Sequence, residues 1–232
     1  MVKERKGSGG GARNKTIRVR GKSNRSASST RWLQRQLNDP YVAQAKRDGF
    51  RSRAAYKLIE IDQKYRFLRS GRNVIDLGAA PGSWSQVALS KLGLSGKLVG
   101  IDLLDIHRLP RAEFIKGDFF DTGLQKQIKD FIGGKADVVL SDMAANTTGN
   151  KQVDHLRTMA LCEGAFEFAI DSLKMGGTFI AKTFQGGTEP LLLKRIKQHF
   201  RLVRHFKPKS SRQESPEMYL IAVGYNGKKK EA

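Results

Sequence analysis

Two acids and two lysines, far apart in the chain, are the residues best suited to catalysis. Asp142 closes an apolar run in VVLSDMAAN, and Lys182 follows another in TFIAKTF, which would leave its amine partly desolvated. Glu217 opens the run EMYLIAVGY, and Lys57 lies in the helical segment RSRAAYKL. A buried amine near carboxylates is a candidate general base. Burial and a second lysine would lower the pKa of Lys182, whereas Asp142 and Glu217 would raise it, and the sequence leaves that balance open.

A second group of polar residues surrounds a glycine-rich turn in VIDLGAAPGSWSQVAL. Gly78 and Gly82 would let the backbone approach a ligand closely at the carboxyl edge of a sheet. Asp76, just before the turn, would repel a pyrophosphate but suits the cationic sulfonium and amino group of S-adenosylmethionine (SAM). Asp102 and Asp118 end the next two predicted strands, in position for the ribose hydroxyls and the adenine edge of that cofactor. Each acid alone could equally be a strand-ending turn residue, but together they predict a SAM site.

The elements that position these residues follow from the alternation of β-branched runs and helical segments. Residues 32–71 have helical periodicity, and the rest of the chain predicts strands at NVIDL, KLVGIDLL, EFIKGDF, ADVVLSD, GGTFIAKTF, FRLVRHF and EMYLIAVGY. Helices are expected after the first, third, fourth and fifth of these strands, which gives an α/β fold with a mostly parallel sheet covered on both faces. The loop from about 207 to 216 is too short for a crossover helix, so the last strand should return antiparallel. That reversal would bring Glu217 beside Lys182, with Lys57 covering the pocket from the preceding helix.

The charge of the chain indicates a polyanionic partner. Lys and Arg number 43 against 22 Asp and Glu, a formal net charge of +21. We expect a disordered basic arm at residues 1–30, one catalytic domain at 31–226 and a short basic tail at 227–232, because the arm is rich in Gly and Ser and poor in apolar residues. The arm is either a solvated tail or, as we favour, a segment that binds phosphates.

Several classes of protein are disfavoured by the same sequence. No apolar run approaches the roughly 20 residues of a membrane span, and none follows the basic N-terminus, so we expect neither membrane association nor export but a cytoplasmic protein. The single cysteine, Cys162, has no partner for a disulfide and no metal-ligand spacing, so we expect it to be packed in the core and expect no metal.

The order of the motifs carries a resemblance to a known family. From about residue 30 to Tyr225 the chain contains, in sequence, RSRAAYKL, DLGAAPGSWSQ, GIDLL, GDF, SDMAAN, AKTFQG and SSRQESPEMYLIAVG. In these motifs it resembles the FtsJ-like ribose 2′-O-methyltransferases. The resemblance implies a Rossmann-like SAM-dependent methyltransferase fold with seven strands, and a substrate in large-subunit (23S) ribosomal RNA, most typically a uridine.

The resemblance also implies roles for particular residues. The family's catalytic tetrad corresponds to Lys57, Asp142, Lys182 and Glu217, and its SAM pocket to Gly82, Trp84, Asp102, Asp118 and Asp142. Two positions depart from the family: Ser83 stands where a second glycine is usual, and Pro216 in SPEMY where an arginine is usual.

Two questions remain open: which RNA is the target, and whether the protein catalyses a reaction at all. Related enzymes with the same tetrad imply transfer RNA or an mRNA cap as other targets, and a ribosome-assembly protein could bind RNA without catalysis. In each case we expect a monomer that contacts phosphates, and Trp32, Tyr41 and Phe50 either stack on a base or pack in the core. The cations expected to contact phosphates beside the arm are Arg31, Arg35, Lys46, Arg47, Arg51 and Arg53.

Overall fold

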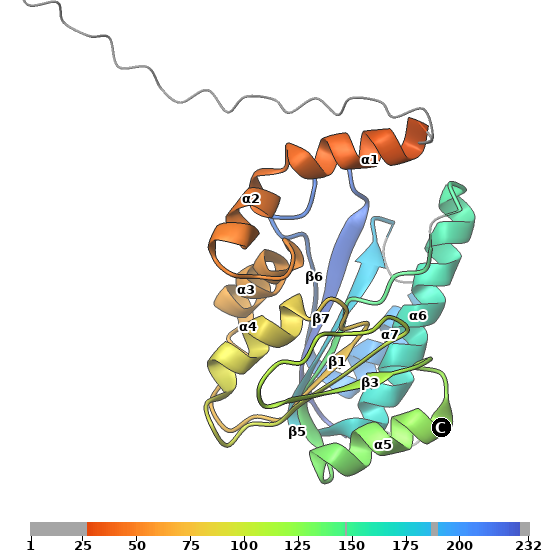
Figure 1. Ribbon diagram of the computed structural model, residues 1–232. Helices are drawn as coiled ribbons and strands as arrows, with labels where there is room; N and C mark the ends of the chain where they lie inside the picture. Colours follow the sequence, from red (N-terminus) through yellow and green to blue (C-terminus); the bar gives the residue numbers. More distant parts are fainter. Residues whose placement is uncertain (1–26, 147, 187–189, 228–232) are drawn as a thin grey trace, which may run out of the picture.

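The computed structural model describes residues 27–146, 148–186 and 190–227, which form seven helices and seven strands in an α/β arrangement (Figure 1). The predictions for residues 1–26 and 228–232 lie outside the described residues. The helices are α1 (Ala27–Leu37), α2 (Pro40–Arg47), α3 (Ala54–Tyr65), α4 (Ser83–Leu92), α5 (Thr122–Ile132), α6 (Lys151–Ser172) and α7 (Pro190–His199). The strands are β1 (Val74–Leu77), β2 (Leu98–Asp102), β3 (Ala112–Lys116), β4 (Ala136–Ser141), β5 (Leu173–Phe184), β6 (Phe200–Phe206) and β7 (Glu217–Tyr225).

The sheet has the order β3-β2-β1-β4-β5-β7-β6. Strands β1 to β5 pair in parallel, whereas β7 is antiparallel to both of its neighbours, β5 and β6. The predicted fold, including the reversed last strand, is therefore confirmed. In the β5–β7 pair Lys182 lies opposite Tyr219 and Phe184 lies opposite Glu217, so the start of β7 meets the end of β5.

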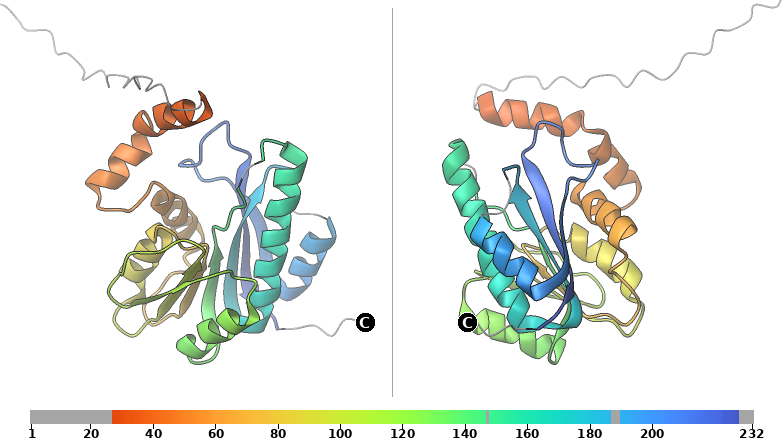
Figure 2. Two further views of the ribbon diagram at one scale, coloured as in Figure 1. Left: turned by 45° about the vertical axis from the view of Figure 1, so that its right-hand side comes forward. Right: turned by 180° about the vertical axis from the view of Figure 1, so that it is seen from behind.

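Helices cover both faces of the sheet, as the predicted strand-helix-strand units require (Figure 2). On one face, side chains of α3 and α4 such as Leu58, Ile61 and Trp84 pack in a core cluster with β-strand residues such as Leu140. On the other face, α5, α6 and α7 pack against the strands, and Cys162 is buried there at 1% exposure, as expected. Burial raises the pKa of this thiol to about 12, which keeps it protonated.

Capping side chains begin several of these helices. Asp39, Asp121 and Asn150 precede α2, α5 and α6, and each accepts hydrogen bonds from backbone N–H groups of the first turn. Helix α1 begins at Ala27, whereas the disordered arm was expected to reach residue 30. Residues 27–30 therefore belong to the helix ASSTRWLQRQL. Helices α1 and α2 lie beyond the edge of the sheet where the parallel strands end (Figures 1 and 2).

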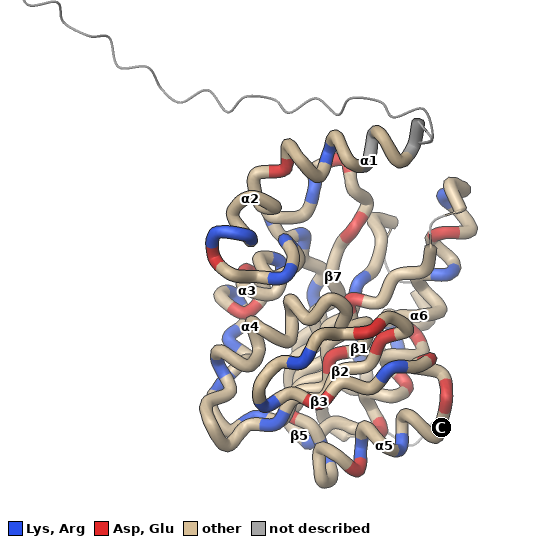
Figure 3. Tube along the Cα trace, in the orientation of Figure 1, with Lys and Arg blue, Asp and Glu red and all other residues tan. Residues whose placement is uncertain are grey.

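The described charges are unevenly distributed. Lys and Arg recur along α2 and α3, while several acids gather near the ends of β1 and β2 (Figure 3). Cations therefore border the carboxyl edge of the sheet on the side of the N-terminal helices, and acids border it over the first strands.

Candidate active site

The two lysines and two acids meet at the carboxyl edge of the sheet. The Lys182 amine lies 2.8 Å from Asp142 Oδ1 and 3.9 Å from Glu217 Oε2, and the Lys57 amine lies 2.7 Å from the same Glu217 oxygen. Lys182 also donates a hydrogen bond to the backbone carbonyl of Asp142 at 2.8 Å. The side chain of Lys182 is 9% exposed, so this amine is desolvated as the sequence predicted. The expected convergence of the four residues is present.

Tyr219 is a fifth member of this cluster that the sequence reading missed. Its hydroxyl donates a hydrogen bond to Asp142 Oδ1 at 2.7 Å, and the Lys57 amine lies 5.8 Å from the centre of its ring. Tyr219 follows Glu217 by two residues, so the alternation of side chains along a strand places both on one face. That spacing was the available clue. Asp142 Oδ1 is therefore shared by the phenol and the Lys182 amine.

The charges of the cluster shift one another's pKa values. Burial favours the neutral form of Lys182, but the Asp142 and Glu217 carboxylates outweigh it and raise the pKa of this lysine. Burial likewise favours neutral Asp142, but Lys182 and Lys57, with hydrogen bonds from Lys182 and Tyr219, hold the pKa of that carboxyl below its usual range. In the protein alone these interactions favour the ammonium form of Lys182, paired with ionised Asp142.

A pocket of about 370 Å³ opens beside Asp142 at the ends of the first strands. Gly78, Asp102, Asp118 and Asp142, all expected at the cofactor site, line it together with apolar side chains such as Ile101 and Phe119. A pocket with an apolar lining and few polar groups is typical of small-molecule sites.

Asp102 and Gly78 shape this pocket in different ways. The two Asp102 oxygens accept hydrogen bonds from the backbone N–H groups of Ala80 and Leu104, both at 2.9 Å, which fixes the carboxylate at the end of β2. Gly78 has a φ of +74°, and a Cβ atom there would lie 2.8 Å from the backbone of Met143. Only glycine therefore lets the turn and the loop after β4 approach each other this closely.

Asp76 is fully buried beneath the glycine-rich turn rather than on the pocket surface. Its Oδ2 atom accepts a hydrogen bond from Ser85 at 2.7 Å, while Oδ1 has no hydrogen-bond partner among the described residues. Burial, opposed by the Ser85 hydrogen bond and reinforced by Asp142 and Asp102, raises the pKa of Asp76 to about 7. Because it is buried, the carboxylate lies outside direct reach of a ligand in the pocket, and its charge can act on such a ligand only through space.

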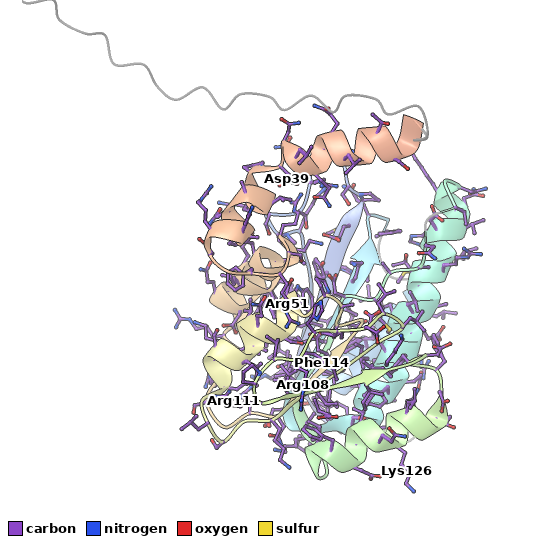
Figure 4. The ribbon with its side chains drawn as sticks, viewed as in Figure 1. Asp39, Arg51, Arg108, Arg111, Phe114 and Lys126 are labelled. Atoms are coloured by element: carbon purple, nitrogen blue, oxygen red, sulfur yellow. The ribbon has the colours of Figure 1, made fainter. Side chains whose placement is uncertain are left out.

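The glycine-rich turn is braced by Arg51, which was expected to bind phosphate. Its guanidinium donates to the carbonyls of Pro81 at 2.8 Å and Arg108 at 3.0 Å, and Figure 4 shows it between α2 and the β2–β3 loop. The guanidinium lies against Gly82 and fills the space that a Cβ atom at this position would need. Ser83, a departure from the family, is accommodated because its hydroxyl pairs with that of Ser52 at 2.8 Å.

Trp84, like Asp76 and Gly82, does not line the pocket expected to hold the cofactor. It is 2% exposed, its indole N–H donates to the carbonyl of Ala54 at 2.9 Å, and its ring lies 5.5 Å from that of Tyr219. In this arrangement Trp84 supports the cluster from behind, by packing α4 against Tyr219.

A cationic cleft of about 390 Å³ borders the cluster on its other side. Arg35, Arg53, Arg212 and Lys57 line it together with Glu217. Asp39, labelled in Figure 4, lies between α1 and α2 and pairs with both Arg53 and Arg212. These ion pairs link the junction of the two helices to the loop before β7.

The remaining expected RNA contacts divide between core and surface. The rings of Tyr41 and Phe50 both pack against Tyr56, so among the alternatives they take the packing role. Lys46 and Arg47 are exposed on α2, while the side chains of Arg31 and Trp32 lie outside the described residues.

Two general classes of feature are absent from the described part of the chain. None of its helices combines the length and the apolar character needed to cross a bilayer. Residues 27–146, 148–186 and 190–227 also contain no group of three or more His, Cys, Asp or Glu side chains placed to hold a metal ion.

The fold is that of the Rossmann-like methyltransferases, and a pocket and a buried lysine lie at the carboxyl edge of its sheet. The sequence profile of the FtsJ-like methyltransferases matches residues 50–225. A protein of Parvibaculum lavamentivorans is 54% identical, covering 97% of this chain and 93% of its own, and one of Rickettsia felis is 53% identical, covering 92% and 96%. Both are named ribosomal RNA large subunit methyltransferase E. A crystal structure from Plasmodium falciparum matches with a TM-score of 0.68 and 35% identity, covering 77% of this chain and 100% of that one. This chain belongs to the FtsJ-like methyltransferase family.

Proposed function

We propose that the protein is a SAM-dependent enzyme that methylates a ribose 2′ hydroxyl in large-subunit (23S) ribosomal RNA, most typically of a uridine, with Lys182 as the general base. The observation that carries the proposal is the convergence of Lys57, Asp142, Lys182 and Glu217 beside the cofactor pocket. The names of the two bacterial relatives support the choice of ribosomal RNA.

The pocket residues fit SAM. Each Asp102 oxygen receives one backbone N–H and retains a lone pair that can accept a ribose hydroxyl of the adenosyl group. Asp118, at the exposed rim, is in position for the adenine edge. The Asp76 carboxylate, buried beneath the turn, would favour the cationic end of the cofactor through its charge and without direct contact. When bound, SAM supplies a methyl group activated by its sulfonium.

The four residues suit proton removal from a sugar hydroxyl. In its neutral form the Lys182 amine takes the proton of the 2′ hydroxyl as the oxygen–methyl bond forms and the methyl–sulfur bond breaks. Asp142 and Glu217 then stabilise the ammonium that results, and Lys57 holds Glu217 in place at 2.7 Å. Because the carboxylates raise the pKa of Lys182, we expect the rate of methyl transfer to increase with pH from neutrality into the alkaline range.

The cationic cleft beside Glu217 supplies the substrate side. Arg35 and Arg212 offer guanidinium groups to phosphates next to the target ribose, and Lys46 and Arg47 extend this positive surface along α2. Arg53 instead shapes the wall of the cleft, because its guanidinium is bonded to Asp39 and to the Ser210 carbonyl. The basic residues that precede α1 add sequence-independent phosphate binding. We place the reaction in the cytoplasm, with the enzyme acting as a monomer on the large ribosomal subunit.

The test is transfer of labelled methyl groups from SAM to undermodified large subunits, naked 23S ribosomal RNA and transfer RNA in parallel assays. Lys182→Met should lower transfer by about 10³-fold or more while leaving SAM binding within a few fold, because it keeps the side-chain length but removes the base. Lys174→Met is the matched control, since Lys174 lies at the other end of β5 in an exposed pair with Asp137. Full activity of Lys182→Met would refute the assignment.

The alternative functions give different results in the same assay. Label on transfer RNA alone would make the protein a transfer RNA methyltransferase. Binding of RNA and SAM with no label on any substrate would favour a ribosome-assembly factor without turnover, against which the complete tetrad argues.

A further inference from the structure

A second groove adjoins the catalytic cluster and has no role in the mechanism above. It lies between the first turns of α6 and the end of β5, and its lining is predominantly apolar. Leu156, 67% exposed, Phe184 and Pro216 provide the apolar surface. The polar and charged residues at its sides are Lys151, Gln152, Asp154, His155, Gln185, Glu214 and Ser215.

The groove and the cationic cleft are separated by one short segment. Residues 214–216 line both, and Glu217 of the catalytic cluster comes directly after them. The backbone N–H of Gln185 donates to the Pro216 carbonyl, which ties this segment to the end of β5. Phe184 lies opposite Glu217 in the β5–β7 pair and two residues after Lys182, so all three side chains are on one face of the sheet.

The chemistry of a nucleotide matches this division. The carbon that bears the 2′ hydroxyl lies between the carbon attached to the base and the carbon attached to the 3′ phosphate. A ribose held with its hydroxyl at Lys182 must therefore direct a flat, largely apolar base and a charged phosphate away from the reaction centre on two sides. One side of Glu217 offers arginines and the other offers Leu156, Phe184 and Pro216.

We propose that this groove binds the nucleobase of the nucleotide that is methylated, with Leu156 and Phe184 contacting its face. The proposal rests on the proposed function and adds a base-binding subsite to it. A base stacks on apolar side chains whatever its identity, and the amides of Gln152 and Gln185 are placed to contact its edge. The target base must accordingly leave its stacked position in the RNA to enter the groove.

The experiment compares an RNA fragment that accepts the methyl group with the same fragment lacking only the base at the target ribose. For the wild-type enzyme kcat/KM should fall about tenfold or more without the base. Leu156→Ser and Phe184→Leu should reduce that preference for the intact fragment at least threefold. Leu94→Ser is the control for Leu156, because Leu94 is 91% exposed in the loop between α4 and β2, at the opposite edge of the sheet, and it should keep the full preference.

The outcomes separate the subsite from the proposed function. No methylation of the intact fragment or of whole large subunits by wild-type enzyme would overturn the proposed function. Normal methylation with equal kcat/KM for both fragments, or an unchanged preference in Leu156→Ser and Phe184→Leu, would overturn the base-binding subsite alone. Folding of the variants is checked by thermal unfolding, and Leu156→Ser keeps the test decisive if Phe184→Leu is unstable.

Discussion

Replacing Asp76 by Asn should stabilise the cofactor-free protein at alkaline pH. The carboxyl of Asp76 is fully buried, and burial raises its pKa to about 7, compared with about 3.9 in an unfolded chain. Between these two values the folded protein binds the proton and the unfolded chain does not, so the free energy of unfolding decreases as pH rises. Asn has nearly the same shape, carries no charge and can still accept the hydrogen bond from Ser85.

The magnitude follows from the difference between the two pKa values. A difference of about three pKa units lowers the free energy of unfolding by about 4 kcal/mol near pH 8, where Asp76 is ionised in both the folded and the unfolded protein. At pH 5 the loss is about 1.5 kcal/mol. The advantage of Asp76→Asn over wild type should therefore grow by about 2.5 kcal/mol between pH 5 and pH 8. Comparing the two pH values cancels the contribution of the amide itself, which is the same at both.

Urea unfolding of wild type and Asp76→Asn at pH 5 and pH 8 measures the difference in their free energies of unfolding. With the same dependence on urea concentration for both proteins, a shift of the unfolding midpoint gives this difference directly. Addition of SAM should narrow the difference at pH 8, because the cationic cofactor stabilises ionised Asp76 and has less effect on the variant. A free-energy difference between the two proteins that stays constant with pH would refute the buried, pH-dependent charge. An equal stabilisation of both proteins by SAM would show that Asp76 does not face the cofactor's positive charge.

Two further substitutions test the contacts around Asp142. Tyr219→Phe removes a hydrogen bond to Asp142, which leaves more of that carboxylate's charge to hold the Lys182 proton. The kcat at pH 7 should therefore fall about tenfold and recover at higher pH, while the KM for SAM stays unchanged. A loss of kcat that is equal at all pH values would contradict this reasoning. Gly78→Ala places a Cβ against the Met143 backbone at a φ of +74° and should lower the free energy of unfolding by about 2 kcal/mol and weaken SAM binding, as measured by urea unfolding and calorimetry. Wild-type stability and affinity of Gly78→Ala would show that the turn can relax.

The sequence predicted the sheet because each strand is a short run of β-branched and aromatic residues with helical segments or turns between them. The errors are at the ends of elements. Strand β5 begins at Leu173 rather than Gly176, because Leu173 pairs with Ala136 across an irregularity in the β4–β5 ladder that no local pattern records. The start of α1 at Ala27 was likewise missed within a segment dominated by Ser and Arg.

The convergence of Asp142, Lys182 and Glu217 could also be predicted, because it depends on strand topology alone: parallel strands end at one edge, and one reversed strand begins there. Contacts between side chains of distant segments could not. Arg51 was read as one of several surface cations, yet it braces the turn at Pro81, and Trp84 turns toward Tyr219 rather than toward the pocket. Both outcomes depend on the direction of a side chain on a helix or loop, which is set by packing.

The ionisation of Lys182 shows most clearly what the structure adds. Its proton is held by two carboxylates, and each of these is shared: Tyr219 also bonds Asp142, and Lys57 bonds Glu217 at 2.7 Å against 3.9 Å for Lys182. Sharing weakens the hold on the proton without removing it, since the pKa of Lys182 is still raised. One more positive charge near Asp142 would be repelled by the ammonium with an energy of about 4 kcal/mol at a separation of 4 Å. The pocket beside Asp142 is where a sulfonium would enter, so we expect the free base to form when the methyl donor is bound rather than before.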